Sequence, residues 1–319
     1  MLERAPDLSD IVRAEALLRP HLWSTAARRS ASLSHRYGAE IVLKPENLQR
    51  LGSFKVRGAI NRVDELARSG VKEVITASAG NHAQGVAYAA TVTGLAATIV
   101  VPETASAAKI DALRRMGADL RLIGMTYDEA EDAAYAIAEA ERIAMVSPYD
   151  GAVIAGQGTV GYELLREEPD LDLLLVPVSA GGLLSGCLIA AKAVNPNITV
   201  VGVQSEAAPA MVAARAAGRI VEVTCTESLA DGLSGNIGRG QLPFSIIQRL
   251  VDDLLLVDEA SIAAAMRQFV ADERLIVEGA GAVGLAALLS GKIDISGRRV
   301  GIVISGGNVA LETLRSVLA

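Results

Sequence analysis

The side chain with the clearest chemical potential is Lys55, in the segment LGSFKVRG. It follows Gly52 and Ser53 at the expected start of a helix over residues 55–68. The positive end of the helix dipole disfavours a cation there, so the Lys55 amine should lose its proton more readily than a solvated lysine. A neutral amine is the form that attacks a carbonyl carbon. The alternative is an ordinary solvated lysine on an amphipathic helix.

A second segment is a turn of small residues between an apolar strand candidate and an apolar helix candidate; it consists of Ser179, Ala180, Gly181 and Gly182. Successive backbone N–H groups there could form a nest that holds a phosphate at the helix N-terminus. A plain strand-to-helix turn explains the same residues. No Gly-Lys-Ser/Thr follows, so the segment does not match the nucleotide-binding P-loop.

A third turn follows the strand candidate at residues 74–77 and consists of Ser78, Ala79, Gly80, Asn81 and His82. Its small side chains leave N–H groups free to bind a substrate carboxylate, and Asn81 can offer its amide to a further oxygen. His82 has neither a nucleophile nor a second histidine near it in the sequence. We therefore expect it to be a packed, hydrogen-bonded residue rather than a catalyst.

The run GAGAVG at residues 279–284 fits the dinucleotide pattern GxGxxG, and residues 275–277 before it could form a strand. A dinucleotide site also needs a carboxylate at the end of the next strand, and the strand candidate at residues 300–304 ends in Ser305 instead. We interpret the run as a helix that begins close against a sheet. A nicotinamide oxidoreductase is the alternative.

Composition indicates a globular protein of about two domains. The 319 residues are 51% hydrophobic and carry a net charge of −7, without clusters of Lys and Arg, which argues against nucleic-acid binding. Two cysteines and three histidines cannot supply a four-ligand zinc site in the usual spacings. The acidic N-terminus lacks the apolar core of a secretory signal, which favours a cytoplasmic protein.

Residues 173–191 contain no charge, which raises the possibility of a membrane span. Pro177 and the turn at residues 179–182 interrupt this run, so we expect a buried strand, a tight loop and a buried helix, and no membrane contact.

Short apolar runs alternate with helical patterns along most of the chain, which predicts βαβ units and parallel sheets. Ligands bind at the carboxyl ends of parallel strands, where the small-residue turns stand. The strand candidates are residues 41–43, 74–77, 97–101, 120–123, 173–178, 199–204, 254–257 and 300–304. The helix candidates include residues 55–68, 81–93, 106–116, 127–140, 183–194 and 261–270.

Several motifs taken together resemble the fold-type II pyridoxal-phosphate enzymes, specifically the threonine/serine dehydratase (ammonia-lyase) group. Their order and spacing match over nearly the whole chain; they are SFKVRGA at 53–59, TASAGNHAQG at 76–85, VIAGQGTVGYEL at 153–164, SAGGL at 179–183, LADGL at 229–233 and SGGN at 305–308. The resemblance implies an α/β fold of two open, twisted, mostly parallel sheets with flanking helices, as in the tryptophan synthase β chain. It also implies a large domain of residues 1–76 and 153–319, a small inserted domain of residues 77–152, and a homodimer.

The resemblance also implies roles for single residues around pyridoxal 5'-phosphate. Lys55 would be the Schiff-base lysine with Phe54 at the ring, and Asn81 would bind the ring hydroxyl oxygen. The segment Ser179–Leu183 would hold the phosphate, with Leu183 as its last residue, and Ser305 would face the pyridine nitrogen. The loop Ser78–His82 would bind the substrate.

This chain departs from the family pattern at three places. Ser179 and Ala180 replace the first two glycines of the phosphate turn, so only backbone conformations open to side chains are comfortable there. Ala79 stands where the family's serine racemases have a serine, which disfavours racemisation. Of the family's cation site, Glu206 and Ala210 are present but the second carboxylate position is Val212. This is a poor cage for a hard cation, so a monovalent metal or none is expected.

The activity implied is β-elimination from a β-hydroxy amino acid, with L-threonine or L-serine as the default, giving a 2-oxo acid and ammonia. A neutral serine hydroxyl at the pyridine nitrogen does not enforce its protonation as an aspartate would, which favours elimination over transamination. The alternatives are another hydroxy amino acid such as 3-hydroxyaspartate or a hydroxyectoine-derived one, a serine racemase-like activity, and a pyridoxal-phosphate-binding protein without turnover.

Overall fold

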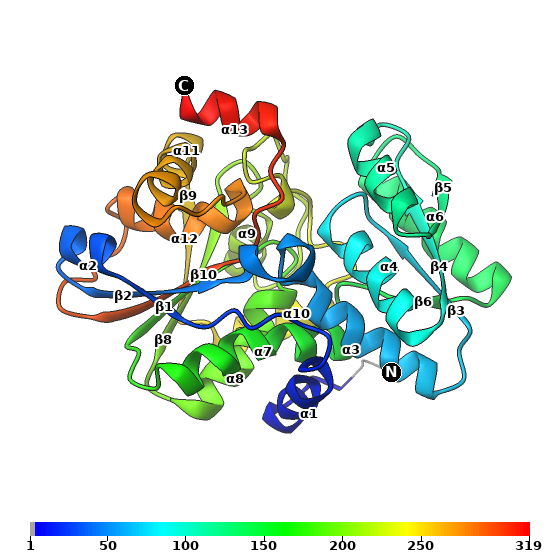
Figure 1. Cartoon of the computed structure of the whole chain (residues 1–319), viewed down its shortest axis with the longest axis horizontal. Coiled ribbons are helices and arrows are strands. Elements are labelled where there is room, and N and C mark those ends of the chain that lie inside the picture. Colours follow the sequence, from blue (N-terminus) through cyan, green and yellow to red (C-terminus); the bar gives the residue numbers. More distant parts are fainter. Residues whose placement is uncertain (1–3) are drawn as a thin grey trace.

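The computed structural model describes residues 4–319 and contains two sheets (Figure 1). The larger sheet has six strands in the order β1-β2-β10-β7-β8-β9, and the smaller has four in the order β5-β4-β3-β6. The β1–β2 pair is antiparallel and the other strand pairs of the two sheets are parallel. The predicted α/β fold of two mostly parallel sheets with flanking helices is therefore confirmed.

The six-stranded sheet is covered by helices on both faces. Its strands are β1 (Arg28–Ser30), β2 (Glu40–Pro45), β7 (Leu173–Pro177), β8 (Thr199–Ser205), β9 (Asp253–Val257) and β10 (Arg299–Ile304). One face packs against α2 (Ala31–Tyr37), α11 (Glu259–Gln268), α12 (Gly279–Leu289) and α13 (Leu311–Leu318). The other packs against α7 (Gly151–Glu167), α8 (Gly182–Val194), α9 (Ala210–Ala217) and α10 (Gln241–Leu250). All five residues of β7 are buried, as a continuous apolar run predicts for a strand covered on both sides.

The four-stranded sheet lies on the right in Figure 1 with its own three helices. Its strands are β3 (Glu73–Ala77), β4 (Ala96–Val101), β5 (Asp119–Leu122) and β6 (Ala144–Met145). Helices α4 (Asn81–Thr93) and α5 (Ala107–Arg115) pack on one face and α6 (Tyr127–Glu141) on the other. The strands span residues 73–145, and the domain limits at residues 77 and 152 stay a prediction.

Helix α3 (Lys55–Arg68) lies between the two sheets (Figure 1). Its apolar side chains share one hydrophobic cluster with α1 (Leu8–Leu18), α4 and α7. Lys55 is therefore the first residue of a helix that packs against both halves of the molecule.

Two expectations concern particular segments. The possible strand at residues 275–277 is wrong: these residues precede α12 and belong to no strand, which removes the strand that a dinucleotide fold needs. The uncharged run at residues 173–191 forms strand β7, a turn and most of α8. Within residues 4–319, no helix combines the length and apolarity needed to cross a bilayer.

Candidate active site

Lys55 is held beside the end of β10 by the backbone that precedes it. The Phe54 N–H donates to the Ser305 carbonyl at 3.1 Å, and Ser53 pairs with Gly306 in an isolated bridge. Gly52 (φ +71°) makes room for this approach, because a Cβ there would lie 2.5 Å from Asn308 Oδ1. The structure thus brings together Lys55 and Ser305, which are 250 residues apart in the sequence.

The Lys55 amine is in a low-dielectric environment. Burial disfavours its charged form and lowers its pKa to about 8, against a smaller opposing effect of the Glu278 carboxylate. The sequence predicts a lowered pKa from the helix dipole, whereas the structure gives burial as the main cause. Nζ lies 5.3 Å from the centre of the Phe54 ring, so the aromatic face covers one side of the amine.

The turn before α8 requires its glycines. Gly181 caps the helix with φ +99°, a backbone conformation that side chains rarely adopt, and a Cβ there would lie 2.6 Å from Ile247 Cδ1. A Cβ at Gly182 would lie 3.0 Å from the Pro148 carbonyl oxygen. The first N–H groups of a helix point outward from its end and suit an anion. Phe54 packs against the hydrophobic cluster that includes Leu183, which joins this turn to the start of α3.

The loop between β3 and α4 is shaped by its own hydrogen bonds. The Ser78 hydroxyl accepts from the Gly80 N–H at 3.1 Å, and Ala79 packs against the cluster formed by α4 and β4. Gly80 caps α4, and a side chain added there would meet no atom of the described residues within 4 Å. The loop thus presents a helix N-terminus to open space.

His82 is buried and uncharged near neutral pH. Its Nε2 lies 3.1 Å from the Val146 carbonyl, which makes Nε2 the protonated donor and leaves Nδ1 an acceptor. Burial, and then the charge of Lys55, lower the pKa of the ring to about 4. Within residues 4–319, Nδ1 has no hydrogen-bond partner.

Asn81 contacts two residues of the larger sheet's half that the sequence analysis did not assign. Its Nδ2 donates to Glu278 Oε1 at 3.2 Å, and its Oδ1 accepts from Asn308 Nδ2 at 2.8 Å. Burial raises the pKa of Glu278 to about 7. The signal that could have found Glu278 is a lone acid between the apolar run Leu275–Val277 and a glycine-rich helix start.

The two cation-site candidates lie in another part of the fold. Glu206 pairs with Lys292, Nζ to Oε1 at 2.9 Å, and Ala210 begins α9. In the part of the chain that the structure describes, no group of three His, Cys, Asp or Glu side chains is arranged to hold a metal ion.

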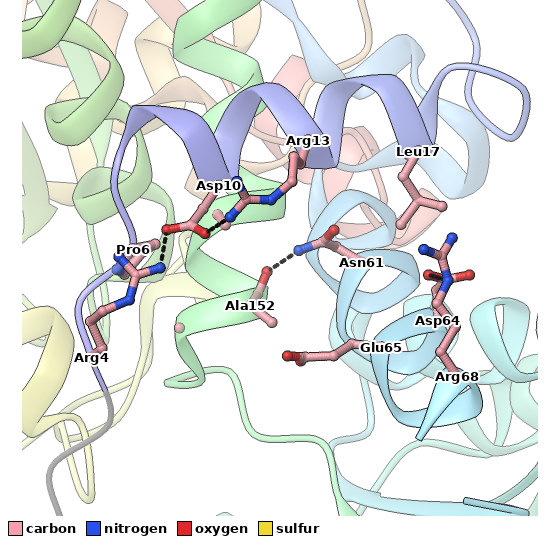
Figure 2. Close-up of a pocket in the computed structure, with 12 residues that line it drawn as sticks. Arg4, Pro6, Asp10, Arg13, Leu17, Asn61, Asp64, Glu65, Arg68 and Ala152 are labelled. Carbon is pink, nitrogen blue, oxygen red and sulfur yellow. Dashed lines mark hydrogen bonds and ion pairs between the residues drawn. The ribbon is translucent and has the colours of Figure 1, made fainter. Parts of the chain in front are cut away.

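A surface hollow of about 450 Å³ lies between α1, α3 and α7, and none of the predicted site residues lines it (Figure 2). Its charged side chains are paired, and Glu65 takes its partner, Arg62, from outside the lining. Figure 2 shows Asp10 between Arg4 and Arg13, and Arg68 pairs with Asp64. This hollow offers no uncompensated charge to a ligand.

Residues 18–306 match the family described as pyridoxal-phosphate dependent enzyme. The chain belongs to this family. It is 44% identical over 313 residues to the L-threonine ammonia-lyase of Thermotoga maritima, covering 98% of this chain and 78% of that relative. The catabolic L-threonine dehydratase of Escherichia coli K12 is 39% identical, with 97% and 95% covered. Among solved structures, maize serine racemase superposes with a TM-score of 0.92 at 35% identity, with 98% and 97% covered. Because this family depends on pyridoxal phosphate, the cofactor that the resemblance implied is confirmed.

Proposed function

We propose that this pyridoxal-phosphate enzyme is an ammonia-lyase that converts L-threonine or L-serine to a 2-oxo acid and ammonia. The observation that carries the proposal is a buried amine, with its pKa lowered to about 8, placed between the loop that begins α4 and the end of β10. The names of the relatives, threonine ammonia-lyase and threonine dehydratase, support it over nearly the full chain.

The residues around Lys55 fit the cofactor. The neutral amine suits its aldehyde. The turn Ser179–Leu183 suits its phosphate because it combines a left-handed Gly181 with a helix N-terminus, an arrangement typical of backbone anion nests. The Asn81 amide suits the ring oxygen and the Ser305 hydroxyl the ring nitrogen, with Phe54 beside the ring. When bound, the cofactor supplies an electron-withdrawing system that makes the α-hydrogen of an amino acid acidic.

The protein's own groups then move the proton and hold the substrate. A Lys55 amine with a pKa of about 8 is present in part as the free base near neutral pH, so it can accept the α-proton and return it. The N–H groups of the Ser78–His82 loop, at the start of α4, suit the substrate carboxylate. Because the His82 ring is uncharged near neutral pH, it offers no second positive group to the substrate carboxylate.

Racemisation is the rival outcome, because maize serine racemase has the same fold. Inversion at the α-carbon of the substrate needs a second group that exchanges a proton on the face of that carbon opposite Lys55. The residue before Gly80 is Ala79, whose methyl group carries no exchangeable proton. We therefore expect elimination to exceed racemisation.

A substrate panel tests the proposal. The purified protein, supplied with pyridoxal phosphate, should release 2-oxo acid and ammonia in equal amounts from L-threonine or L-serine. The panel also includes 3-hydroxyaspartate and a hydroxylated diamino acid. Formation of D-serine from L-serine is measured in parallel to detect racemisation. The variant Lys55→Ala is the control and should lose elimination by at least about a thousandfold, since it removes the group that transfers the proton. Normal elimination by Lys55→Ala would contradict the mechanism.

We also propose that the protein is a cytoplasmic homodimer. Three large apolar side chains, Trp23, Leu48 and Ile276, are each at least half exposed. Hydrogen bonds join the segments that carry them, from Gln49 to the Trp23 carbonyl and from Asn47 to the Ile276 carbonyl. An exposed apolar patch of this kind suits a second copy of the chain. Light scattering should give a dimer, and Trp23→Glu should give a monomer. The free thiols of Cys187 and Cys225 suit a reducing compartment.

A further inference from the structure

The side chain of Asn81 is held at both ends of its amide. Oδ1 accepts from Asn308 Nδ2 at 2.8 Å, and Nδ2 donates to Glu278 at 3.2 Å. Asn308 Nδ2 also donates to the Leu51 carbonyl at 2.7 Å, which fixes the donor. Turning the Asn81 amide over would place its oxygen against the carboxylate and its nitrogen against a donor, so both contacts would become repulsive.

Backbone groups place the Glu278 carboxylate. Glu278 N–H donates to the Gly306 carbonyl and Glu278 Oε2 accepts from the Asn308 N–H, each at 3.1 Å. Gly306 leaves the space for it, because a Cβ at that position would lie 2.4 Å from Oε1. The side chain is nearly fully buried, at 6% exposure. Glu278 therefore reaches from the start of α12 to α4, which belongs to the other sheet (Figure 1).

The charged groups that face Glu278 are Lys55 on α3 and Asp231 in the 3-10 turn Asp231–Leu233. Burial is the main cause of its raised pKa, Asp231 adds to it, and Lys55 opposes it. The effect on Lys55 is the reverse: burial lowers the pKa of the amine, and the Glu278 charge raises it. Each group therefore favours the charged form of the other.

We propose that Glu278 is a positioning residue of the cofactor site: its buried carboxylate orients the Asn81 amide and places a negative charge near the Lys55 amine. The inference rests on the proposed function, because that function gives Asn81 and Lys55 their roles toward the cofactor. Glu278 itself needs no contact with cofactor or substrate. A glutamine removes the charge but keeps one acceptor oxygen, and at the Oε2 position that oxygen lies 3.4 Å from Asn81 Nδ2 and 3.1 Å from the Asn308 nitrogen.

The experiment measures how the cofactor-free, full-length protein captures pyridoxal phosphate from about pH 6 to about pH 10, a window that spans both titrations. The capture rate is followed by the absorbance of the lysine-bound cofactor, and the affinity by equilibrium dialysis on the pH plateau. The variants are Glu278→Gln and Glu278→Ala. The matched control is Glu273→Gln, which replaces an equally buried carboxylate that bonds to Ser30 in another part of the fold.

For Glu278→Gln we expect the midpoint of the capture profile to move to lower pH by about half a unit or more, because the charge that keeps Lys55 protonated is gone. Its plateau affinity should fall less than that of Glu278→Ala, since one acceptor oxygen remains within reach of Asn81 while the new amide nitrogen faces a donor. For Glu278→Ala we expect the same shift and about tenfold weaker binding, because Asn81 loses a charged hydrogen-bond partner. Glu273→Gln should match wild type.

A Glu278→Gln profile that superposes on those of wild type and Glu273→Gln would overturn the inference, and so would unchanged binding by a folded Glu278→Ala. If Glu278→Ala does not fold, the shift in Glu278→Gln decides. The proposed function fails separately, when wild type captures the cofactor but releases no 2-oxo acid from threonine or serine; the capture profiles then still decide the role of Glu278.

Discussion

Replacing Gly181 by alanine tests the phosphate turn most directly, because the residue combines positive φ with close packing. The conformation at φ +99° should cost an alanine about 1–2 kcal/mol. Its Cβ would also lie 2.6 Å from Ile247 Cδ1 and 3.1 Å from Met211 Cε, and relieving such overpacking should cost about 1–3 kcal/mol more. Urea unfolding followed by circular dichroism should therefore show a loss of about 2–5 kcal/mol.

Gly218→Ala is the matched control. Gly218 also has positive φ, at +68°, but a Cβ there meets nothing within 4 Å and the residue lies at the end of α9. It should lose only the strain, about 1–2 kcal/mol. The difference between the two variants isolates the packing at the turn.

The binding measurement uses pyridoxal phosphate and pyridoxal, which differ only in the phosphate. If the alanine displaces the N–H groups of the turn, one charge-assisted hydrogen bond should be lost, which weakens pyridoxal phosphate by about tenfold to a hundredfold. Binding of pyridoxal should change by about twofold or less, since the turn does not touch the rest of the ring. Equal weakening of both ligands in Gly181→Ala, or no weakening of either, would refute the assignment of this turn to the phosphate.

Three further results follow from the structure. Glu46→Ala leaves the buried Arg57 guanidinium without its two-oxygen partner and should destabilise the fold by about 3–5 kcal/mol in urea unfolding. His82 has a folded pKa of about 4 against an ordinary value of 6.5, so the unfolded chain binds more protons between these pH values. Stability should therefore fall as pH drops from about 6.5 to about 4, and unfolding at a series of pH values should show a shallower slope in His82→Gln. Gly58→Ala would place a Cβ 2.6 Å from the Val153 carbonyl, so it should lower the melting temperature and weaken cofactor retention measured by dialysis.

The sequence predicts eight of the ten strands of residues 4–319 and misses the short edge strands β1 and β6, because only longer apolar runs stand out in the sequence. The expected strand at residues 300–304 is β10, one residue longer at its start, and the helix at 55–68 is predicted with its observed limits. Helix α7 is absent from the predicted helices because Gly156, Gly158 and Gly161 lower its local helix propensity. In the structure these glycines serve tertiary packing: a Cβ at Gly156 would lie 2.6 Å from Gly58 Cα. Packing between helices outweighs propensity there.

The candidate site is predictable only where chemistry is carried by a local pattern. Lys55 is identified from its place at a helix start, yet the main cause of its lowered pKa is burial, which no local pattern shows. Glu278 lies in no recognisable motif. Its proposed role is apparent only from its contact with Asn81, which is 197 positions away in the sequence. Contacts of this kind depend on how the two sheets sit together, which periodicity does not give.

A buried ion network fixes the orientation of α3, the helix that begins with Lys55. Successive residues of a helix are separated by about 100° around its axis, so Arg57 points about 200° away from Lys55. Arg57 is fully buried and bonds to Glu46 after β2 and Glu163 on α7, and Glu163 also pairs with Lys44 on β2. Such a network adds little net stability, because desolvation offsets its attraction, but it accepts one geometry. Helix α3 is thereby fixed to the six-stranded sheet on one side, which leaves the opposite side, with Lys55, facing the loop that begins α4.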